Sequence, residues 1–267
     1  MSDISSILAP AESEPFARPR RGLKFEDCQF YHTMDIPGVG TVKGFGDGNW
    51  DLRGCLDPML GGIDYAGKRV LEVGPASGQL TFEMERRGAD VVAVDVPHDH
   101  EWDIIPFPAN QDRWQRGSKA GWTPQTNAWW FAHEHFNSRA RMVYVSGGAL
   151  DRASLGAFDV AVMANVLLHT RDHLKTVENC ARKTTGRIVI VEQWHPDLEH
   201  TGLPLCCLKG LASRPDNWND WFRFSSAYFV RHLEILGFGN FWVTRFSAPW
   251  NGMPIEYFTL VASRLNA

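Results

Sequence analysis

Residues 69–78 carry side chains whose types and spacing suit the binding of an adenosine-containing molecule. An apolar strand contains the acid Glu72 and leads into a turn of small residues that runs from Gly74 to Gly78. The next apolar strand ends in Asp95. In α/β proteins such a turn lets the backbone approach a ligand closely, and an acid at the end of the following strand accepts hydrogen bonds from ribose hydroxyls. Ordinary strand–helix turns also use glycine, so the turn alone leaves both interpretations open.

A histidine and an acid follow two later apolar runs. His169 comes soon after residues 158–163, and Glu192 directly follows residues 187–191, with Trp194 two positions further on. The carboxyl ends of parallel strands meet at one edge of a sheet, where α/β proteins bind ligands. Histidine titrates near neutral pH, so His169 is a candidate general base for a substrate group that must lose a proton. The alternative is that His169 packs at the start of the next helix. Glu192 and Trp194 are candidates for contact with a substrate.

Alternating strands and helices must position these residues. The helix after the first strand is expected to have Ser77 as its cap and to stop at Gly88. An insertion, residues 96–141, is expected to contain a helix that starts at Thr123-Pro124, because proline favours the first helical turn. The further predicted elements are a short helix at 51–60, strands at 142–145, 158–163, 187–191, 241–246 and 255–261, and helices at 171–183 and 225–236.

Composition and charge set the class of the protein. The chain has 267 residues, of which 44% are hydrophobic and 22% charged, and its net charge is −4. This is the balance of a globular protein, without the basic excess that typifies a large nucleic-acid footprint. Five cysteines without C-x-x-C spacing are expected to be reduced thiols, and no long apolar run is present, which together predict a cytoplasmic protein. Residues 1–64 are expected to form an N-terminal extension and candidate lid, with 1–21 mobile, ahead of a domain at 65–267.

Four motifs follow one another in an order that resembles class I S-adenosylmethionine-dependent methyltransferases: Glu72-Val-Gly-Pro-Ala-Ser-Gly78, Asp95, Phe158-Asp-Val160 and Asn165-Val-Leu-Leu-His169. The resemblance covers roughly residues 65–265. It implies an α/β fold with a doubly wound, seven-stranded, mostly parallel sheet whose last strand is antiparallel. It also implies S-adenosylmethionine as the cofactor, with the methionine end at the glycine turn, the ribose at Asp95 and the adenine at the turn after the third strand.

The cofactor-binding residues that the resemblance implies are Glu72, Gly74, Ala76, Ser77, Gly78, Asp95, Ala149, Leu150 and Asn165. Two positions depart from the family pattern. Ala76 replaces the middle glycine of the turn, so its backbone is expected to avoid the left-handed conformation. Gly148 replaces the carboxylate that often lies beside adenine, which leaves the backbone and Leu150, or Asp151, to hold the base.

A closer likeness involves the N-terminal extension. Phe30-Tyr31-His32 and Asp51-Leu52-Arg53 resemble methyltransferases related to the tRNA wobble-uridine group, whose relatives include enzymes with other acceptors, small molecules among them. Tyr31, His32 and Arg53 are therefore candidates to cover the site and bind substrate, with Arg53 able to fork onto a carboxylate. The alternative is ordinary packing of the extension on the domain.

Histidines, acids and tryptophans concentrate in the insertion. A metal site can be imagined from His98, His100, His133, His135, Asp99 and Asp103. Two histidines two positions apart on one helix point about 200° apart, so loop and helix-surface roles are favoured and no metal is predicted. The chain has 11 tryptophans. Core packing and stiffening of a lid explain them, and an aromatic pocket for a cationic substrate or product is the alternative.

The sequence therefore predicts an enzyme that transfers a methyl group from S-adenosylmethionine to a small-molecule acceptor, with neither a membrane nor nucleic acid as partner. Three alternatives stay open. One is S-methylation of a thioether amino acid such as methionine, which needs no base. The second is a tRNA-modifying methyltransferase, which the net charge of −4 disfavours. The third is a non-catalytic cofactor-binding protein. The acceptor atom, the pathway and the oligomeric state are not predicted.

Overall fold

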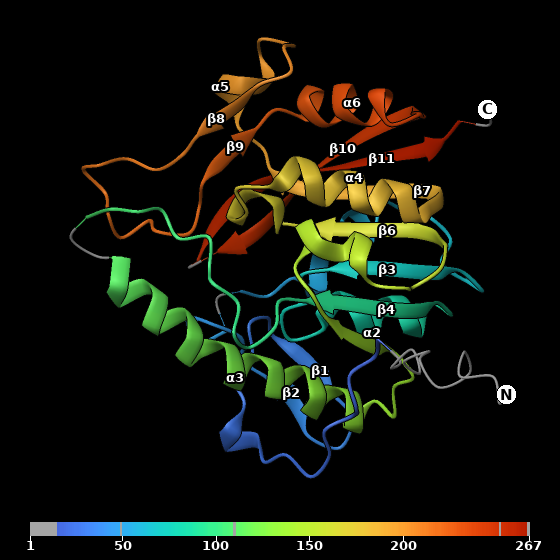
Figure 1. Cartoon of the computed structure of the whole chain (residues 1–267). Coiled ribbons are helices and arrows are strands. Elements are labelled where there is room, and N and C mark those ends of the chain that lie inside the picture. The colour runs from blue at the N-terminus through green and yellow to red at the C-terminus, as the bar shows by residue number, and fades with distance from the viewer. Residues whose placement is uncertain (1–14, 49, 109–110, 251, 266–267) are drawn as a thin grey trace, which may run out of the picture.

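A seven-stranded sheet forms the centre of the molecule (Figure 1). The computed structural model describes residues 15–48, 50–108, 111–250 and 252–265, and leaves out the side chains of 111–115 and 118. In spatial order the strands are β10 (Phe238–Trp250), β11 (Met253–Arg264), β7 (Thr184–Gln193), β6 (Phe158–Ala164), β3 (Arg69–Val73), β4 (Asp90–Asp95) and β5 (Arg141–Tyr144). Only β11 runs against the other six, since it pairs antiparallel with both β7 and β10. The predicted α/β fold is confirmed.

The two faces of the sheet are covered by different segments. Because successive strand residues point to opposite faces, Val70 lies in one core and Leu71 in the other. The helices are α1 (Leu56–Met59), α2 (Gln79–Arg86), α3 (Gln111–His135), α4 (His173–Lys183), α5 (Pro196–Glu199) and α6 (Ser226–Ile235). Helices α4 and α6 contribute to the core on one face, whereas α2, α3 and the N-terminal extension fill the other. In the described part of the chain, no helix is both long and apolar enough to cross a membrane.

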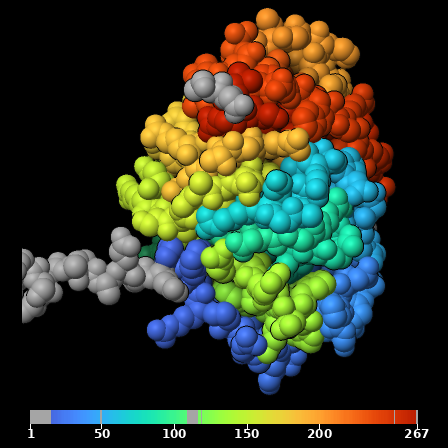
Figure 2. All heavy atoms as spheres, turned by 90° about the vertical axis from the view of Figure 1, so that its right-hand side faces the viewer, coloured from blue at the N-terminus to red at the C-terminus, as the bar shows by residue number. Residues whose placement is uncertain are grey.

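Figure 2 views the molecule from the right-hand side of Figure 1. Its colour bands run from red through yellow to cyan and green, which is the spatial order of the strands and not their order in the sequence. After β3 the chain builds outward through β4 and β5, then returns to place β6 on the other side of β3. The chain connections therefore lead to opposite sides of β3. In α/β proteins, ligands bind at the carboxyl ends of the strands at such a point.

The N-terminal extension packs on the domain along most of its length. Its elements are the 3-10 turns η2 (Phe25–Asp27) and η3 (Arg53–Cys55) and the hairpin of β1 (Met34–Ile36) and β2 (Gly40–Val42). The predicted mobile segment is wrong for residues 15–21, and residues 1–14 lie outside the described part. The Ala17 N–H donates to the Met142 carbonyl at 2.8 Å, and the Arg141 guanidinium lies over the Phe16 ring. These contacts cover the exposed edge of β5.

The insertion helix is longer than predicted. Helix α3 begins at Gln111, twelve residues before the expected start at Thr123, and Pro124 lies inside it. Trp129 and Trp130 in its second half are fully buried, whereas the described residues at 116, 117, 119 and 120 are exposed. The sequence at 111–120 is mostly polar and shows no apolar periodicity, so the helix signal that remains is the proline, which favours a first helical turn.

Two 3-10 turns and a hairpin come after parallel strands of the sheet in the chain, and the hairpin lies at the upper left of Figure 1. The 3-10 turns η4 (Gly147–Arg152) and η5 (Leu167–His169) follow β5 and β6 directly. A hairpin of β8 (Cys206–Leu208) and β9 (Phe222–Phe224) projects between α5 and α6 and encloses a long connecting loop. Neither strand of this hairpin is predicted from the sequence. It brings residues far along the chain to the edge where ligands bind.

The glycine turn adopts a strained backbone at the position that lacks glycine. Ala76 has φ +50°, between Gly74 at +74° and Gly78 at +94°, so the expectation that Ala76 avoids the left-handed region is wrong. The turn needs three left-handed residues to pass from strand to helix, and alanine adopts that conformation at a cost of about 1–2 kcal/mol. Gly78 has a second constraint, because an added Cβ would lie 2.3 Å from the Phe82 ring.

Substitutions in this turn should act in opposite directions. Ala76→Gly should raise the free energy of unfolding by about 0.5–1 kcal/mol, because it relieves left-handed strain that exceeds the entropy glycine adds to the unfolded chain. Gly78→Ala should lower it by about 2–4 kcal/mol, because it adds both strain and a clash with Phe82. Urea unfolding monitored by circular dichroism measures both. Equal destabilisation by the two variants would contradict the strain argument.

Candidate active site

The predicted cofactor residues come together at the carboxyl edge of the sheet. Backbone hydrogen bonds tie the strand ends to each other: the Gly74 N–H donates to Val94 at 2.9 Å, and the Asn165 N–H donates to Val191 at 2.7 Å. The Val145 N–H donates to the Asp95 carbonyl at 2.8 Å. Because Val73 of β3 also pairs with Met163 of β6, the ends of β3, β4, β5 and β6 lie next to one another, and the turns that follow them begin at the same edge of the sheet.

Two carboxyl groups form the electrostatic centre of this edge. Burial raises the pKa of Glu72 to about 7, the Thr81 hydroxyl that donates to it acts in the opposite direction, and the nearby Asp95 charge adds to the rise. Burial likewise raises the pKa of Asp95 to about 6, against a 2.8 Å hydrogen bond from the Val96 N–H. A cation placed here would favour the ionised form of both groups. The site is thus built to gain from a positively charged ligand.

Ser77 joins the turn to the N-terminal extension and does not cap α2. The N-cap residue is Gly78, without a side-chain cap, so the predicted cap is wrong. Instead the Ser77 hydroxyl accepts the N–H groups of Tyr31 at 3.1 Å and His32 at 3.4 Å. The extension therefore lies directly on the turn. A serine at this position can either cap the following helix or accept hydrogen bonds from another segment, and the sequence does not distinguish the two roles.

Among the described side chains, two buried amide oxygens next to the turns after β3 and β6 have no hydrogen-bond partner, and a third is Oδ1 of Asn179 on α4. The two beside the turns are Oδ1 of Asn165, whose backbone is left-handed with φ +52°, and Oε1 of Gln79 in the first turn of α2. Leaving such an oxygen unpaired costs about 1–3 kcal/mol unless a ligand or water supplies a donor. Both therefore fit hydrogen-bond donors of a bound molecule.

The turn after β5 is held firmly in place. The Leu150 side chain is completely buried in the core, so it anchors the turn, whereas Asp151 is exposed. The Asn179 amide on α4 donates to the carbonyls of Gly147 and Gly148, each at 3.0 Å. The turn thus presents mainly backbone at Ala149 toward its surroundings, as expected where no carboxylate follows β5.

His169 lies in a charged network that the sequence did not reveal. Its Nδ1 is 3.0 Å from the Asn219 carbonyl and 3.3 Å from the Asp220 carboxylate. Lys209 donates to Asp220 at 2.7 Å and to Gln193 at 3.2 Å. The available signal is the alternation of Phe222, Arg223 and Phe224, which is typical of a strand. It predicts a strand just after Asp220 but does not show that Asp220 lies beside His169.

Glu192 and Trp194 occupy different surroundings at the end of β7. Burial raises the pKa of Glu192 to about 8, although its carboxyl accepts the Leu167 N–H at 3.1 Å. Glu192 therefore holds the η5 turn that carries His169. Trp194 packs against Phe258 under the Arg245 guanidinium. The structure thus gives Trp194 a packing role on the side of β11.

The three substrate-binding candidates of the extension, Tyr31, His32 and Arg53, also lie in different surroundings. Tyr31 is close enough to Asp220 for its charge, together with the larger effect of burial, to raise the Tyr31 pKa to about 12. His32 lies beside Tyr31, and its Nδ1 is buried without a partner. Arg53 does fork onto a carboxylate, but that group is Asp51 of its own segment, with Asp35 as a second partner. Tyr31 and His32 are thus joined to the glycine turn by their backbone, whereas Arg53 is held in surface ion pairs.

The insertion supplies packing more than ligands. His133 is buried and 3.0 Å from the Ala140 carbonyl, so the expected helix-surface role is wrong for it; His135 is 3.2 Å from the Pro37 carbonyl. Among the described side chains, no group of three or more histidines, cysteines or acids is placed to hold a metal. Trp129 donates to the Thr81 hydroxyl at 3.3 Å, so it packs behind Glu72. The side chain of Trp114 lies outside the described part.

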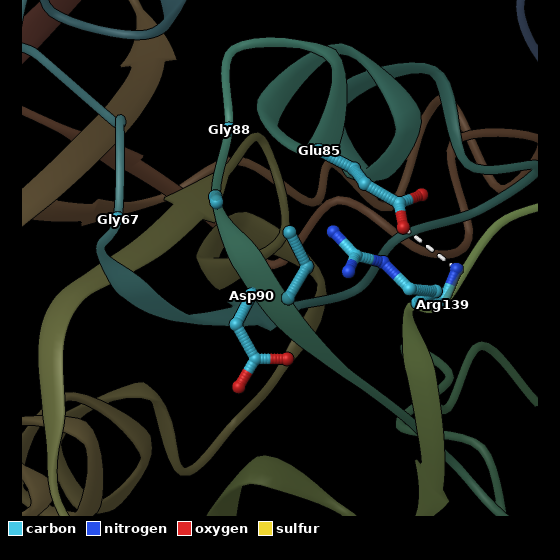
Figure 3. Close-up of a pocket in the computed structure, with 7 residues that line it drawn as sticks. Gly67, Glu85, Gly88, Asp90 and Arg139 are labelled. Carbon is cyan, nitrogen blue, oxygen red and sulfur yellow. Dashed lines mark hydrogen bonds between the residues drawn. The ribbon is translucent and has the colours of Figure 1, made fainter.

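A hollow of about 230 Å³ lies away from this edge. Figure 3 shows it beside Asp90, at the amino end of β4, with Glu85 accepting the Arg139 N–H at 2.6 Å. It is lined by two turn glycines and the ends of elements. None of the predicted site residues lines it, so we assign it no part in the chemistry.

Comparison with known proteins now identifies the family. A family model described as a methyltransferase domain matches residues 56–236. The chain belongs to this family. No protein of curated function matches the sequence. The methyltransferase match leaves out most of the extension and the two closing strands.

Two solved structures share the fold of this methyltransferase domain. The N-terminal domain of EvdMO1 with SAH bound has a TM-score of 0.60 at 16% identity, over 90% of this chain and 93% of that chain. An O-methyltransferase family protein from Burkholderia thailandensis has a TM-score of 0.53 at 12% identity, over 81% of this chain and 57% of that one. The prediction of a class I methyltransferase is confirmed, and the closer likeness to the tRNA wobble-uridine group stays a prediction.

Glu192 should make stability depend on pH. Its folded pKa of about 8 exceeds the usual 4.5, so between these values the folded state binds a proton that the unfolded state lacks. The free energy of unfolding should therefore fall as pH rises from 5 to 8.5. Glu192→Gln should reduce that fall by about 1–3 kcal/mol, measured by urea unfolding at each pH. The exposed Glu101→Gln is the control, and parallel curves for Glu192→Gln and the unsubstituted protein would refute the assignment.

Proposed function

We propose that the protein transfers a methyl group from S-adenosylmethionine to a small-molecule acceptor. The observation that carries this proposal is the pair of buried carboxyls, Glu72 and Asp95, at the level ends of adjacent strands beside a glycine turn. Membership of the methyltransferase family supports it, as does the SAH-bound neighbour of the same fold.

The residues present fit this methyl donor. S-adenosylmethionine carries an ammonium and a sulfonium charge, hydroxyl donors on its ribose and an amine on its adenine. Glu72 and Asp95 supply the negative charge, and the unpaired amide oxygens of Asn165 and Gln79 supply acceptors for its donors. Asp95 would hold the ribose, and the Ala149 backbone would lie along the adenine. The donor, when bound, supplies an already activated methyl group.

The protein's own contribution to the reaction is alignment and proton removal. In-line displacement at a sulfonium needs the acceptor atom held close to the methyl carbon, and orientation of that kind is worth several kcal/mol. Tyr31 and His32, pinned on the turn through Ser77, would exclude water from the donor side. His169 would accept the proton of an acceptor that must lose one. The extension would thus act as the lid predicted for residues 1–64.

The rival functions differ in what they require from these residues. A thioether acceptor such as methionine needs no base and needs charge partners for its own carboxylate, yet the Arg53 guanidinium is already engaged by Asp51 and Asp35. A tRNA acceptor needs a basic surface, and the chain is acidic with a net charge of −4. A non-catalytic protein that only binds S-adenosylmethionine would not need a histidine held between charged residues as His169 is.

Donor binding should depend on Asp95 and on pH. Asp95→Asn should weaken S-adenosylmethionine binding about 10–100-fold, because charge-assisted hydrogen bonds to the ribose are lost. In the unsubstituted protein affinity should rise from pH 5.5 to 8, because Glu72 and Asp95 must be ionised to meet the cation. Calorimetry measures both effects.

A matched control lies on the same strand. Asp90 is exposed at the opposite end of β4, where it pairs with Arg141, so Asp90→Asn should leave the affinity for S-adenosylmethionine unchanged. Equal losses from Asp90→Asn and Asp95→Asn, or an affinity that does not vary with pH, would exclude the proposed donor site.

Transfer of a labelled methyl group identifies the acceptor class. The purified protein with labelled S-adenosylmethionine should label members of a panel of small hydroxyl, amine and thioether compounds, and should not label bulk tRNA. Label in tRNA that disappears at high salt would favour the nucleic-acid alternative. Binding of S-adenosylmethionine without label in any compound would favour the non-catalytic alternative.

A further inference from the structure

The β8–β9 hairpin places two charged side chains, Lys209 and Asp220, beside His169. Cys206, Cys207 and Leu208 pair with Phe224, Arg223 and Phe222 in register. Continuing that register, the Lys209 N–H donates to the Trp221 carbonyl at 2.7 Å, which brings Lys209 beside Asp220. The Trp221 N–H donates in turn to the Leu168 carbonyl at 2.8 Å. The hairpin is therefore fastened to the turn that carries His169.

The contacts of His169 fix which ring nitrogen carries a proton. A carbonyl oxygen can only accept, so the 3.0 Å contact with Asn219 requires Nδ1 to be the N–H of the neutral ring. Asp220, 3.3 Å from the same nitrogen, favours the same tautomer. The lone pair then lies on Nε2, which is the nitrogen able to take a proton from an acceptor. The ring is about one-third exposed, so an acceptor can reach it.

Asp220 is held as an anion against the effect of its own burial. Burial acts to raise its pKa, but the hydrogen bond from His169, the charge that His169 carries once it is protonated, and the charge and hydrogen bond of Lys209 outweigh that effect and lower the pKa to about 2. The charge of Asp220 also helps to raise the pKa values of Tyr31 and Glu192, and it acts against the burial that lowers the pKa of His195. A permanent carboxylate beside Nδ1 stabilises the imidazolium that forms when Nε2 gains a proton.

We propose that Asp220 is a positioning residue for His169 as general base, that Lys209 keeps Asp220 ionised and in place, and that the acceptor is consequently a hydroxyl group. This inference rests on the proposed methyl transfer and names its acceptor. The acceptor O–H bond breaks and its proton passes to Nε2. The oxygen lone pair forms a bond to the methyl carbon while the carbon–sulfur bond breaks and its electrons stay on sulfur. The products are a methyl ether, a neutral thioether and an imidazolium that releases its proton to water.

The network suits a hydroxyl better than the other acceptor classes. A thioether has no proton to give, so a base oriented by a buried anion would contribute nothing to its methylation. An amine is methylated through its free lone pair and loses its proton after the bond has formed. A hydroxyl of ordinary acidity is a poor nucleophile until the proton is partly transferred, and base catalysis there is typically worth 10²–10⁴-fold.

The test compares two phenols in proteins with single substitutions. The probes are 4-methylphenol, which is protonated at neutral pH, and 4-nitrophenol, which is largely ionised, alongside methionine and benzylamine as acceptors of the other classes. The variants are Asp220→Asn and Lys209→Met, with Asp216→Asn as the control because Asp216 is an exposed acid of the same loop. SAH affinity is measured for every protein by calorimetry.

For 4-methylphenol, Asp220→Asn should lower kcat about 10–100-fold, with KM and SAH affinity within about twofold of the unsubstituted values. For 4-nitrophenol the loss should shrink to about threefold or less, because no proton remains to be removed. Lys209→Met should show the same pattern to a smaller extent, and Asp216→Asn should show none. A merely structural role of Asp220 would lower the two rates equally.

Three results would overturn the inference. Label that enters only methionine or benzylamine assigns another acceptor class while the proposed methyl transfer stands. Equal losses for the two phenols in Asp220→Asn remove the positioning role. Absence of transfer to all four probes, with SAH binding intact, excludes base-assisted transfer to a hydroxyl, and the broader acceptor panel then decides whether the proposed function survives.

Discussion

The parallel pairing of β3 with both β4 and β6 is the constraint on which the site depends. Register brings Val73 opposite Val94 on one side and Met163 on the other, so all three strands end at the same level. The connection after β3 leads to β4 on one side, and the chain later returns to β6 on the other, so the turns after β3 and β6 lie next to each other. Val166 fills the space in front of Gly74, which shows how closely these turns approach.

A second layer of contacts ties the N-terminal extension and the insertion to the same turn. Ser77 accepts two N–H groups from the extension, and Trp129 of the insertion donates to Thr81, which itself donates to Glu72. Both segments thus converge on the turn from outside the sheet. Rigidity of the turn depends on residues that the family match at 56–236 includes only in part.

Strands and their terminal polar residues could be predicted because each is a local signal. Apolar runs ending in Asp95, Asn165 and Glu192 are visible in the sequence, and their common edge follows from parallel pairing. The methyltransferase fold and the expected donor-binding residues follow from the family resemblance that these motifs carry in their order along the chain. Leu150 and Trp194 could be placed at strand ends, but the direction of their side chains depends on packing that no local pattern encodes.

Long-range partners could not be predicted for a different physical reason. Asp220 and Lys209 reach His169 from the loop of a hairpin whose two strands have three residues each, and no local pattern pairs these strands or brings them to His169. Their charges look like those of any surface loop. The left-handed Ala76 was also missed, because tertiary packing around the turn overrides the preference of one residue. The same holds for Pro124 inside α3, where downstream burial of Trp129 and Trp130 offsets a poor helix residue.

The β8–β9 hairpin has a consequence for how such an enzyme diversifies. It lies in one segment between α5 and α6, and its loop contributes Lys209 and Asp220, the two charges beside His169, from outside the strands that lead to the glycine turn and to Asp95. Exchange, lengthening or shortening of this segment would alter which molecules are methylated while the apparatus for holding the methyl donor stays intact. A lineage built on this plan can explore new substrates by changing one loop, without first having to rebuild its core.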